Sequence, residues 1–247
     1  MNDNLGNRMK EKFEDRSRFF LPRRCPVVIR VDGKAFHTLT RYMKKPFDPM
    51  FITCMNLTAS TLCREIQGSV FAYVQSDEIS VLLCDYKKRN SDAWFNYNIQ
   101  KMVSVSASIA TSTFTKYFET FKDQFEQGAK ESFHRSRPIF DARCFSIPDM
   151  VEVANYFIWR QKDAERNSIQ MLARSLYSHK ELHQKSVSDM HDMLHTKGLN
   201  WNNLETRYKR GGLYYRSDEN NVGSLECPIF SKTDFLQKNI PVHGYDL

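Results

Sequence analysis

The sequence has 247 residues, enough for one large domain or for a core domain with an extension. Its 41% hydrophobic and 26% charged residues are typical of a globular protein and exclude a linker or low-complexity protein. The formal net charge of +7 favours a polyanionic partner.

The N-terminal residues 1–24 lack the apolar core of a signal peptide, and no stretch approaches the ~18 apolar residues of a membrane span. We therefore expect a cytoplasmic protein with no membrane partner. No two cysteines form a close CxxC pair, and most lie in apolar segments, which predicts reduced core thiols rather than zinc ligands or disulfides. The cysteines are Cys25, Cys54, Cys63, Cys84, Cys144 and Cys227.

Apolar runs and amphipathic stretches predict four strands and two helices in the order βαββαβ. They cover residues 26–31, 49–68, 70–74, 79–84, 96–118 and 138–147. The order is that of the ferredoxin-like split βαβ arrangement, an α+β fold with an antiparallel sheet and helices on one face. The first strand ends at Asp32 and Gly33, and an acidic turn at residues 75–78 joins the second and third strands.

Residues 148–247 are predicted to form a helical extension and tail packed on the core of residues 1–147. Ser146 and Asp149 predict the start of a long helix that reaches Tyr177. Two shorter helices follow near 178–184 and 186–196, and Gly211-Gly212 marks a turn between possible short strands.

The extension carries most of the positive charge. Residues 160–216 hold eleven Lys and Arg against six Asp and Glu, interleaved with Trp201, Tyr208, Tyr214 and Tyr215. Basic groups attract phosphates and exposed aromatic rings stack on bases, so this region is a candidate RNA-binding surface. The alternative is a solvated helix face with buried aromatic residues.

In a ferredoxin-like sheet the end of the first strand lies beside the turn between the second and third strands. Asp32 and Asp77 are therefore expected to face each other. Two adjacent carboxylates repel unless cations neutralise them, and oxygen ligands suit Mg²⁺. With the Gly33 carbonyl they would hold two Mg²⁺ ions that activate a hydroxyl and stabilise a pyrophosphate leaving group. The alternative is that either Asp only caps a turn.

These residues also resemble the tRNA-His guanylyltransferase superfamily, over residues 5–216. The matching segments are residues 30–37 (RVDGKAFH), 45–46 (KP), 75–78 (QSDE) and 159–163 (WRQKD). The resemblance implies a polymerase- or cyclase-type palm that uses two Mg²⁺ ions at Asp32, Gly33 and Asp77. It also implies addition of nucleotides to the 5′ end of tRNA in the 3′-to-5′ direction, with GTP or ATP as substrates, by a homotetramer.

The resemblance further implies roles for individual residues. Catalytic roles fall to Asp32, Asp77, Lys45, Ser76 and Glu78. Nucleotide binding falls to Lys34, Ala35, Phe36, His37, Lys45, Ser76 and Asp77, with backbone N–H groups of the turn cradling phosphates. RNA binding falls to Lys101, Arg160, Asn167, Lys209 and Arg210.

Several of these residues have plainer alternatives. A polar turn before a buried strand would also select Ser76 and Glu78, and His37 could cap or pack. An isolated helix lysine such as Lys101 is often only solvated. Arg160 could simply pair with Asp163, one helical turn away.

One segment departs from the pattern of eukaryotic members, which read His-Ile-Asn-Asn-Leu-Tyr-Asn where residues 165–171 read ERNSIQM. Of the three asparagines only Asn167 is present. This favours the bacterial and phage-like branch, which extends truncated or triphosphorylated tRNA ends against a template. A nucleotidyl cyclase and a non-catalytic nucleotide- or RNA-binding module remain alternatives.

Overall fold

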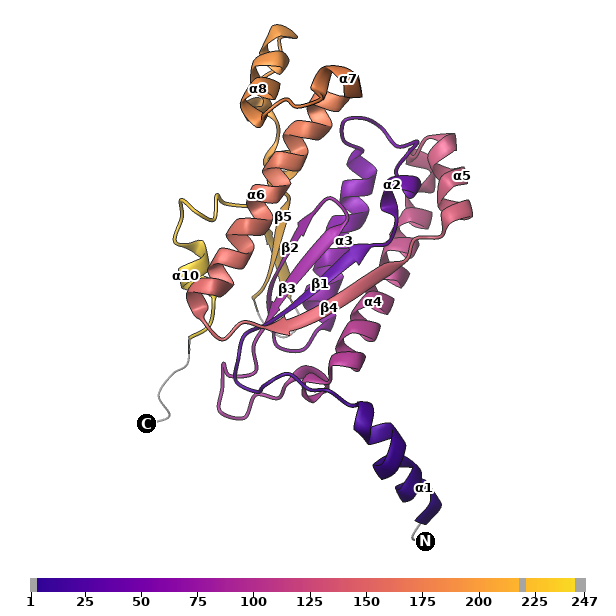
Figure 1. Cartoon of the computed structure of the whole chain (residues 1–247), viewed down its shortest axis with the longest axis vertical. Helices are drawn as coiled ribbons and strands as arrows, with labels where there is room; N and C mark the ends of the chain where they lie inside the picture. The colour runs from indigo at the N-terminus through magenta and orange to yellow at the C-terminus, as the bar shows by residue number, and fades with distance from the viewer. Residues whose placement is uncertain (1–3, 218–220, 243–247) are drawn as a thin grey trace.

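A computed structural model describes residues 4–217 and 221–242; part of the predicted tail, at 218–220 and 243–247, lies outside these ranges. Six antiparallel strands form one sheet in the order β4-β1-β3-β2-β5-β6 (Figure 1). The strands are β1 (Val27–Gly33), β2 (Ser69–Gln75), β3 (Glu78–Leu83), β4 (Phe140–Ser146), β5 (Gly212–Arg216) and β6 (Val222–Leu225). The first four confirm the predicted ferredoxin-like α+β arrangement.

The helices are α1 (Asn4–Met9), α2 (Phe36–Leu39), α3 (Pro49–Glu65), α4 (Ile99–Thr120), α5 (Gln127–Ser136), α6 (Met150–Arg174), α7 (His179–Leu182), α8 (Val187–Thr196), α9 (Thr206–Lys209) and α10 (Phe235–Asn239). None of those within the described ranges is long and apolar enough to cross a bilayer. All six cysteines are free, as predicted.

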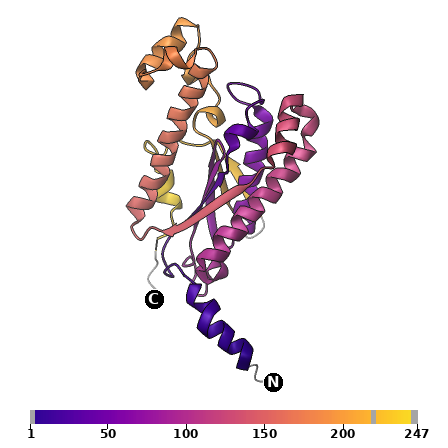
Figure 2. The same cartoon turned by 45° about the vertical axis from the view of Figure 1, so that its right-hand side comes forward.

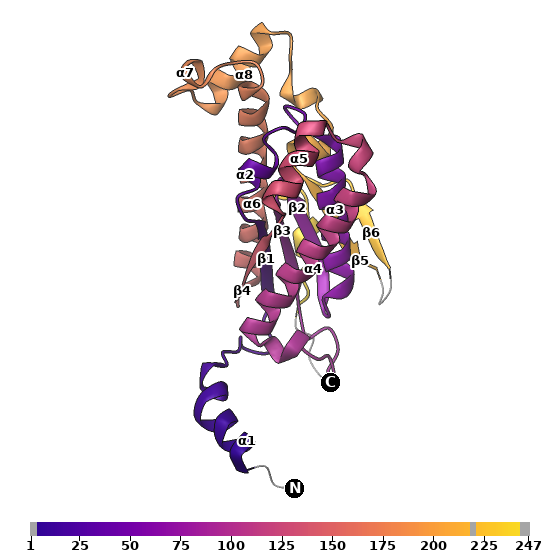
Figure 3. The same cartoon turned by 90° about the vertical axis from the view of Figure 1, so that its right-hand side faces the viewer.

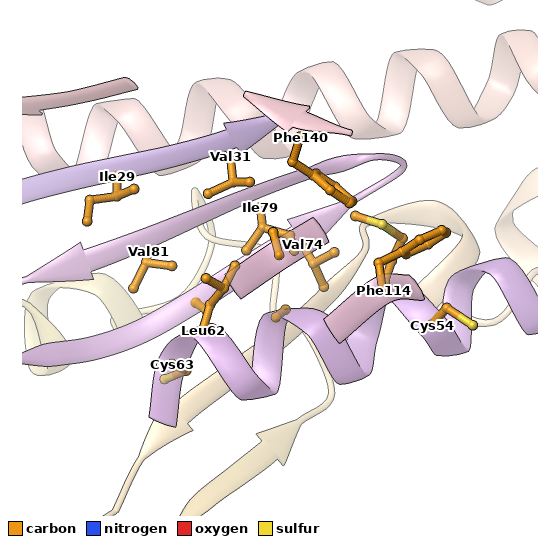
Figure 4. Close-up of a cluster of buried hydrophobic side chains, with 14 of the residues drawn as sticks. Ile29, Val31, Cys54, Leu62, Cys63, Val74, Ile79, Val81, Phe114 and Phe140 are labelled. Carbon is orange, nitrogen blue, oxygen red and sulfur yellow. The ribbon is translucent and has the colours of Figure 1, made fainter. Parts of the chain in front are cut away.

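Helices α3 and α4 cover one face of the sheet (Figure 3). Because side chains alternate along a strand, every second residue of β1 and β3 points into this layer. Ile29, Val31, Ile79 and Val81 belong there to one buried cluster with Phe114 of α4 (Figure 4). This apolar layer fixes the register of the central strands, and with it the position of their tips.

Helix α6 packs against the other face, through Phe157 on Phe71, and extends beyond the sheet to carry α7 and α8 (Figures 1 and 2). Its N-cap is Asp149, which accepts hydrogen bonds from the backbone of Val151 and Glu152, and not Ser146. The carboxylate of Asp149 is the stronger cap because it lies directly before the first helical residue.

Two features differ from the sequence prediction. Helix α5 and the single turn α2 lie outside the six elements predicted for residues 1–147. In addition, β5 pairs with β2, so strands from the predicted extension widen the core sheet. The open edge of β2 supplies the hydrogen-bonding groups that these short strands require.

Candidate active site at the strand tips

The two acidic turns lie side by side. Asp32 pairs in register with Glu78 across β1 and β3, and the backbone N–H of Gly33 donates to the carbonyl of Asp77 at 3.0 Å. The end of β1 is thus hydrogen-bonded to the hairpin turn that carries Asp77. The structure brings together the three residues predicted to bind metal.

Gly33 is required by its surroundings. A Cβ atom at this position would lie 2.5 Å from the ring of Phe36. That ring is 3% exposed and packs against Phe51, Phe114 and Phe140. The missing side chain lets the core ring pass directly beneath the site, which holds the turn after Asp32 in place.

The electrostatics of the site favour a bound cation. Burial, followed by repulsion from Asp32, raises the pKa of Asp77 from 3.8 to about 6. Burial and then Asp141 raise the pKa of Asp32, opposed by nearby arginines. Both pKa shifts arise because carboxylates lie close together and partly shielded from water, and a divalent ion would reverse them.

Asp141 is a further carboxylate that the sequence reasoning missed. It pairs with Asp32 across β1 and β4, so both side chains lie on the same face of the sheet, and Arg143 contacts Asp141 at 3.3 Å. The sequence offered one clue to its position. Asp141 and Arg143 are two residues apart, so they lie on the same face of a strand, and the ferredoxin-like order places that strand beside β1. Asp141 is exposed and sits at the open edge of the site.

The residues present fit Mg²⁺ better than a transition metal. No three His, Cys, Asp or Glu side chains converge as a closed site anywhere in residues 4–217 or 221–242. Asp32, Asp77 and the carbonyl of Gly33 offer oxygen atoms only. Mg²⁺ typically takes one or two carboxylates and completes its octahedron with water and phosphate oxygens, so this set leaves positions on the ion for water and for a phosphorylated substrate.

Glu78 is engaged elsewhere. Its Oε1 accepts from Arg160 Nε at 2.7 Å and its Oε2 from Arg160 Nη2 at 2.6 Å, with side chains that are 9% and 8% exposed. Burial raises the pKa of Glu78, and the hydrogen bonds and charge of Arg160 oppose that rise. Arg160 also contacts Asp163 at 3.2 Å and stacks over the Trp159 ring at 4.5 Å. This geometry favours a positioning role for Arg160 over direct RNA contact, and for Glu78 over metal binding.

The predicted phosphate-binding turn follows Gly33 directly. The backbone N–H of Lys34 donates to the carbonyl of Ile139 at 2.8 Å, and Ala35 has a left-handed backbone conformation with φ of 55°. Among the described residues, the N–H groups of Ala35, Phe36 and His37 have no acceptor. They remain available for a phosphate, whereas the side chain of Phe36 belongs to the core.

Lys45 and Ser76 flank this turn. Lys45 is exposed and donates to the carbonyl of Thr40 at 3.1 Å, a contact that a phosphate could replace. Ser76 is exposed and holds a left-handed φ of 50° at the hairpin tip.

A cavity of about 80 Å³ opens beside Ser76, between α3, α6 and the segment 207–211. Asn167 and Lys209 line it, and Phe47 stacks on Tyr208 at 5.0 Å between ring centres. Gly211 anchors the segment, because its φ is +83° and a Cβ atom would lie 2.1 Å from the carbonyl oxygen of Val74. The cavity brings two of the predicted RNA-binding residues next to the acidic turn.

The other predicted RNA-binding residues lie elsewhere. Arg210 belongs to the segment 207–211 but does not line the cavity; it is half-buried, and its carbonyl accepts from the Tyr73 hydroxyl at 2.7 Å. Lys101 is exposed in the first turn of α4. Thr111 of that helix contacts Phe140, the partner of Gly33, so Lys101 lies about 15 Å further along the axis, at 1.5 Å per residue. Lys101 is not part of the acidic site within one chain.

An antiparallel palm with paired carboxylates at the tips of its central strands is an arrangement that suits metal-assisted nucleotidyl transfer. Residues 6–148 match the model of the tRNAHis guanylyltransferase family, and the chain belongs to that family. A bacterial tRNA(His) guanylyltransferase-like protein in complex with ATP superposes with a TM-score of 0.87 at 37% identity, covering 97% of this chain and all of that one.

Other relatives agree with this assignment. A bacterial guanylyltransferase-like protein in complex with GTP superposes with a TM-score of 0.73 at 35% identity, over 93% of this chain and 95% of that one. The tRNA(His) guanylyltransferase of Saccharomyces cerevisiae is 26% identical over 209 residues, covering 79% of this chain and 84% of the yeast protein.

Proposed function

We propose that this enzyme adds nucleotides to the 5′ end of tRNA in the 3′-to-5′ direction against a template, and that it repairs 5′ ends rather than acting on tRNA-His alone. The observation that carries the reaction is the juxtaposition of Asp32 and Asp77 through the Gly33–Asp77 hydrogen bond. The family supports the transfer to tRNA. The similarity to the bacterial guanylyltransferase-like proteins, together with the altered segment 165–171, supports the broader substrate range.

Asp32, Asp77 and the Gly33 carbonyl would hold two Mg²⁺ ions. When bound, the ions would lower the pKa of the attacking 3′-hydroxyl and neutralise charge on the phosphates. The N–H groups of residues 35–37 would hold a triphosphate, with the side chains of Lys34, His37 and Lys45 around it. GTP is the expected nucleotide, and ATP is a second candidate because a similar protein was solved with it.

Arg160 would keep Glu78 charged and fixed beneath the hairpin, so that Ser76 and Asp77 keep one orientation. Ser76 lies between the acidic site and the cavity lined by Asn167 and Lys209. We place the reacting 5′ end of the RNA in this cavity, beside Ser76.

We further propose that residues 148–247 supply most of the RNA-binding surface of a palm formed by residues 1–147, and that the enzyme is a homotetramer. Lys101 lies about 15 Å along α4 from the level of Gly33, too far to act in the acidic site of its own chain. In an assembly it could instead contact RNA that reacts in the acidic site of another subunit.

The test is to incubate the protein with Mg²⁺, labelled GTP and tRNA transcripts that lack one or more 5′ nucleotides. We expect templated labelling of the 5′ end, which Asp32→Ala and Asp77→Ala abolish and which Asp123→Ala, a change at a 92% exposed carboxylate, preserves. Absence of labelling with all four nucleotides, or full activity of both variants, would refute the proposal. Conversion of ATP or GTP alone to a cyclic nucleotide would show a cyclase instead.

A further inference from the structure

A second cavity, of about 260 Å³, lies between α2 and α5 and is separate from the one beside Ser76. Arg41 and Tyr42, which follow α2, form one wall, and Ser132 and Arg135 of α5 form the other. The two helices lie side by side near the end of β1 (Figures 1 and 3). The hydroxyl of Ser132 donates to the carbonyl of Thr38 at 2.9 Å, which fixes the walls relative to each other.

The two arginines that line this cavity are not neutralised by ion pairs within the part of the chain that the structure describes. Within residues 4–217 and 221–242, neither Arg41 nor Arg135 has an ion-pair partner, whereas the neighbouring Lys44 and Lys130 pair with Glu126 and Asp123 at 3.9 and 4.0 Å. The guanidinium of Arg41 lies only over the ring of Tyr42, at 5.6 Å. Two exposed guanidinium groups facing one cavity repel each other, so the site favours an anion.

One carboxylate, Glu131, also borders the cavity, and Gln127 donates to its Oε1 at 3.0 Å. Two arginines against one carboxylate leave the lining positive. The hydroxyls of Thr38 and Ser136 add donors around it, whereas that of Ser132 already donates to the Thr38 carbonyl. Guanidinium groups and hydroxyls together are the donors that proteins use on phosphate oxygens.

The cavity is tied to the acidic site through the chain itself. Arg41 follows Gly33 by eight positions, four of them in α2, which limits their separation to roughly 20 Å. The backbone N–H of Lys34 also donates to the carbonyl of Ile139, at 2.8 Å, so the segment after α5 returns to the same turn. A polyanion that enters the acidic site can therefore pass over Arg41 and Arg135.

We propose that the cavity between α2 and α5 binds backbone phosphates of the RNA within the first few nucleotides of its reacting end. This inference rests on the proposed function for the identity of the RNA. RNA is favoured over the triphosphate held at residues 35–37, because α2, with its buried Phe36 and Leu39, separates that turn from Arg41 along the chain. The ring of Tyr42, which is 53% exposed, gives a sugar or base of the same strand a surface to rest on.

The test uses the full-length protein and a fluorescent tRNA transcript that lacks its 5′ nucleotide. Arg41→Gln with Arg135→Gln is compared with Arg64→Gln with Arg89→Gln, which removes the same charge from exposed arginines outside both sites. Affinity is measured by anisotropy between about 50 and 200 mM salt, and GTP affinity is measured on the same samples. Circular dichroism checks that each variant is folded.

We expect the Arg41, Arg135 variant to lose about tenfold in tRNA affinity at low salt and to lower the slope of log K against log salt by about two, one per arginine. GTP affinity should change less than twofold, and reversal to Glu at both positions should deepen the RNA defect. A tRNA affinity and slope equal to those of the control pair would overturn the proposal. So would a fall in GTP affinity with unchanged tRNA affinity, because the cavity would then serve the nucleotide.

Binding is measured without turnover, so the two proposals can fail separately. If the Arg41, Arg135 variant loses tRNA affinity as expected but the wild-type protein adds no nucleotide, the proposed reaction is refuted and the proposed phosphate-binding cavity is supported. If nucleotide addition is seen and the variants bind like the control, the reverse holds.

Discussion

The Asp77→Asn substitution should stabilise the metal-free protein while it abolishes nucleotide addition. Burial and the charge of Asp32 raise the pKa of Asp77 from 3.8 to about 6. This difference of roughly two pH units corresponds to about 3 kcal/mol, at about 1.4 kcal/mol per unit. Neutral Asn has nearly the same shape and does not pay the cost of a buried charge.

The sign follows from proton binding. Between about pH 4 and 6 the folded protein holds a proton on Asp77 that the unfolded chain has lost, so stability falls as the pH rises through this window. Above about pH 6 the whole penalty is present in the wild type and absent from the Asn variant. Below about pH 4 the carboxyl is protonated in both states, and the two proteins should become equally stable.

The assay is urea denaturation in a chelator at about pH 7.5 and again at about pH 4. We expect Asp77→Asn to gain about 1 to 3 kcal/mol at the higher pH, or roughly 3 to 10 °C in Tm for a chain of this size. Asp123→Asn, at a 92% exposed carboxylate, should stay within about 0.5 kcal/mol of the wild type. Addition of Mg²⁺ should then stabilise the wild type and leave Asp77→Asn unchanged.

No gain at the higher pH, or an equal gain at both, would refute the reasoning. The first result would mean that Asp77 is solvated and needs no cation. The second would mean that the substitution acts through packing rather than charge.

Arg160→Met should lower the free energy of unfolding, measured in urea, by about 3 to 5 kcal/mol, because it leaves Glu78 buried and unpaired. Adding Glu78→Gln should recover part of this loss, and additive losses from the two substitutions would contradict the pairing. Gly33→Ala should lower the free energy of unfolding by about 1 to 3 kcal/mol and slow nucleotide addition, since the new Cβ would lie 2.5 Å from the Phe36 ring. An unchanged rate and Tm would argue against this contact. Mg²⁺ affinity measured by calorimetry should fall as the pH drops below about 6, with proton release on binding, because Asp77 must lose its proton first; a pH-independent affinity would exclude Asp77 as a ligand.

The meeting of Asp32 and Asp77 could be predicted because it depends only on strand order. Once residues 26–31, 70–74 and 79–84 are strands of a ferredoxin-like sheet, topology alone places the end of the first beside the turn of the hairpin. Side-chain alternation then fixes which face each carboxylate occupies. Asp141 follows the same rule and was missed only because its strand was not aligned with β1.

The pair Glu78–Arg160 could not be predicted in this way. Its members are 82 positions apart, and their contact depends on how α6 is rotated and placed on the sheet, which packing against Phe71 and Tyr73 decides. Sequence spacing pointed instead to a bond between Arg160 and Asp163, which is also present at 3.2 Å. A local pattern identifies local partners, and the long-range partner proved to be the stronger one.

Helix α5 left a weaker signal in the sequence. Its segment is strongly polar, and only Phe125, Ala129 and Phe133 recur at four-residue intervals to mark an apolar side. In the structure these residues are buried, and Phe133 stacks on Phe118 of α4 at 3.7 Å. Phe125 also stacks on Phe118, at 4.2 Å. In the sequence, a short apolar stripe is too weak a pattern to distinguish this helix from a loop before the fold is known.

The hairpin turn separates two neighbouring carboxylates into different tasks. No arginine in the described part of the chain bonds to Asp77, and its raised pKa marks a group that would bind a cation, whereas both oxygens of Glu78 accept from Arg160. If Glu78 were also free, it would add a further negative charge beside Asp32 and push the pKa values of the whole group upward until one carboxyl stayed protonated. By neutralising Glu78, Arg160 keeps Asp32 and Asp77 as the two carboxylates available for metal. The buried ion pair is thus a condition for the metal site, and its worth should appear in Mg²⁺ affinity as much as in stability.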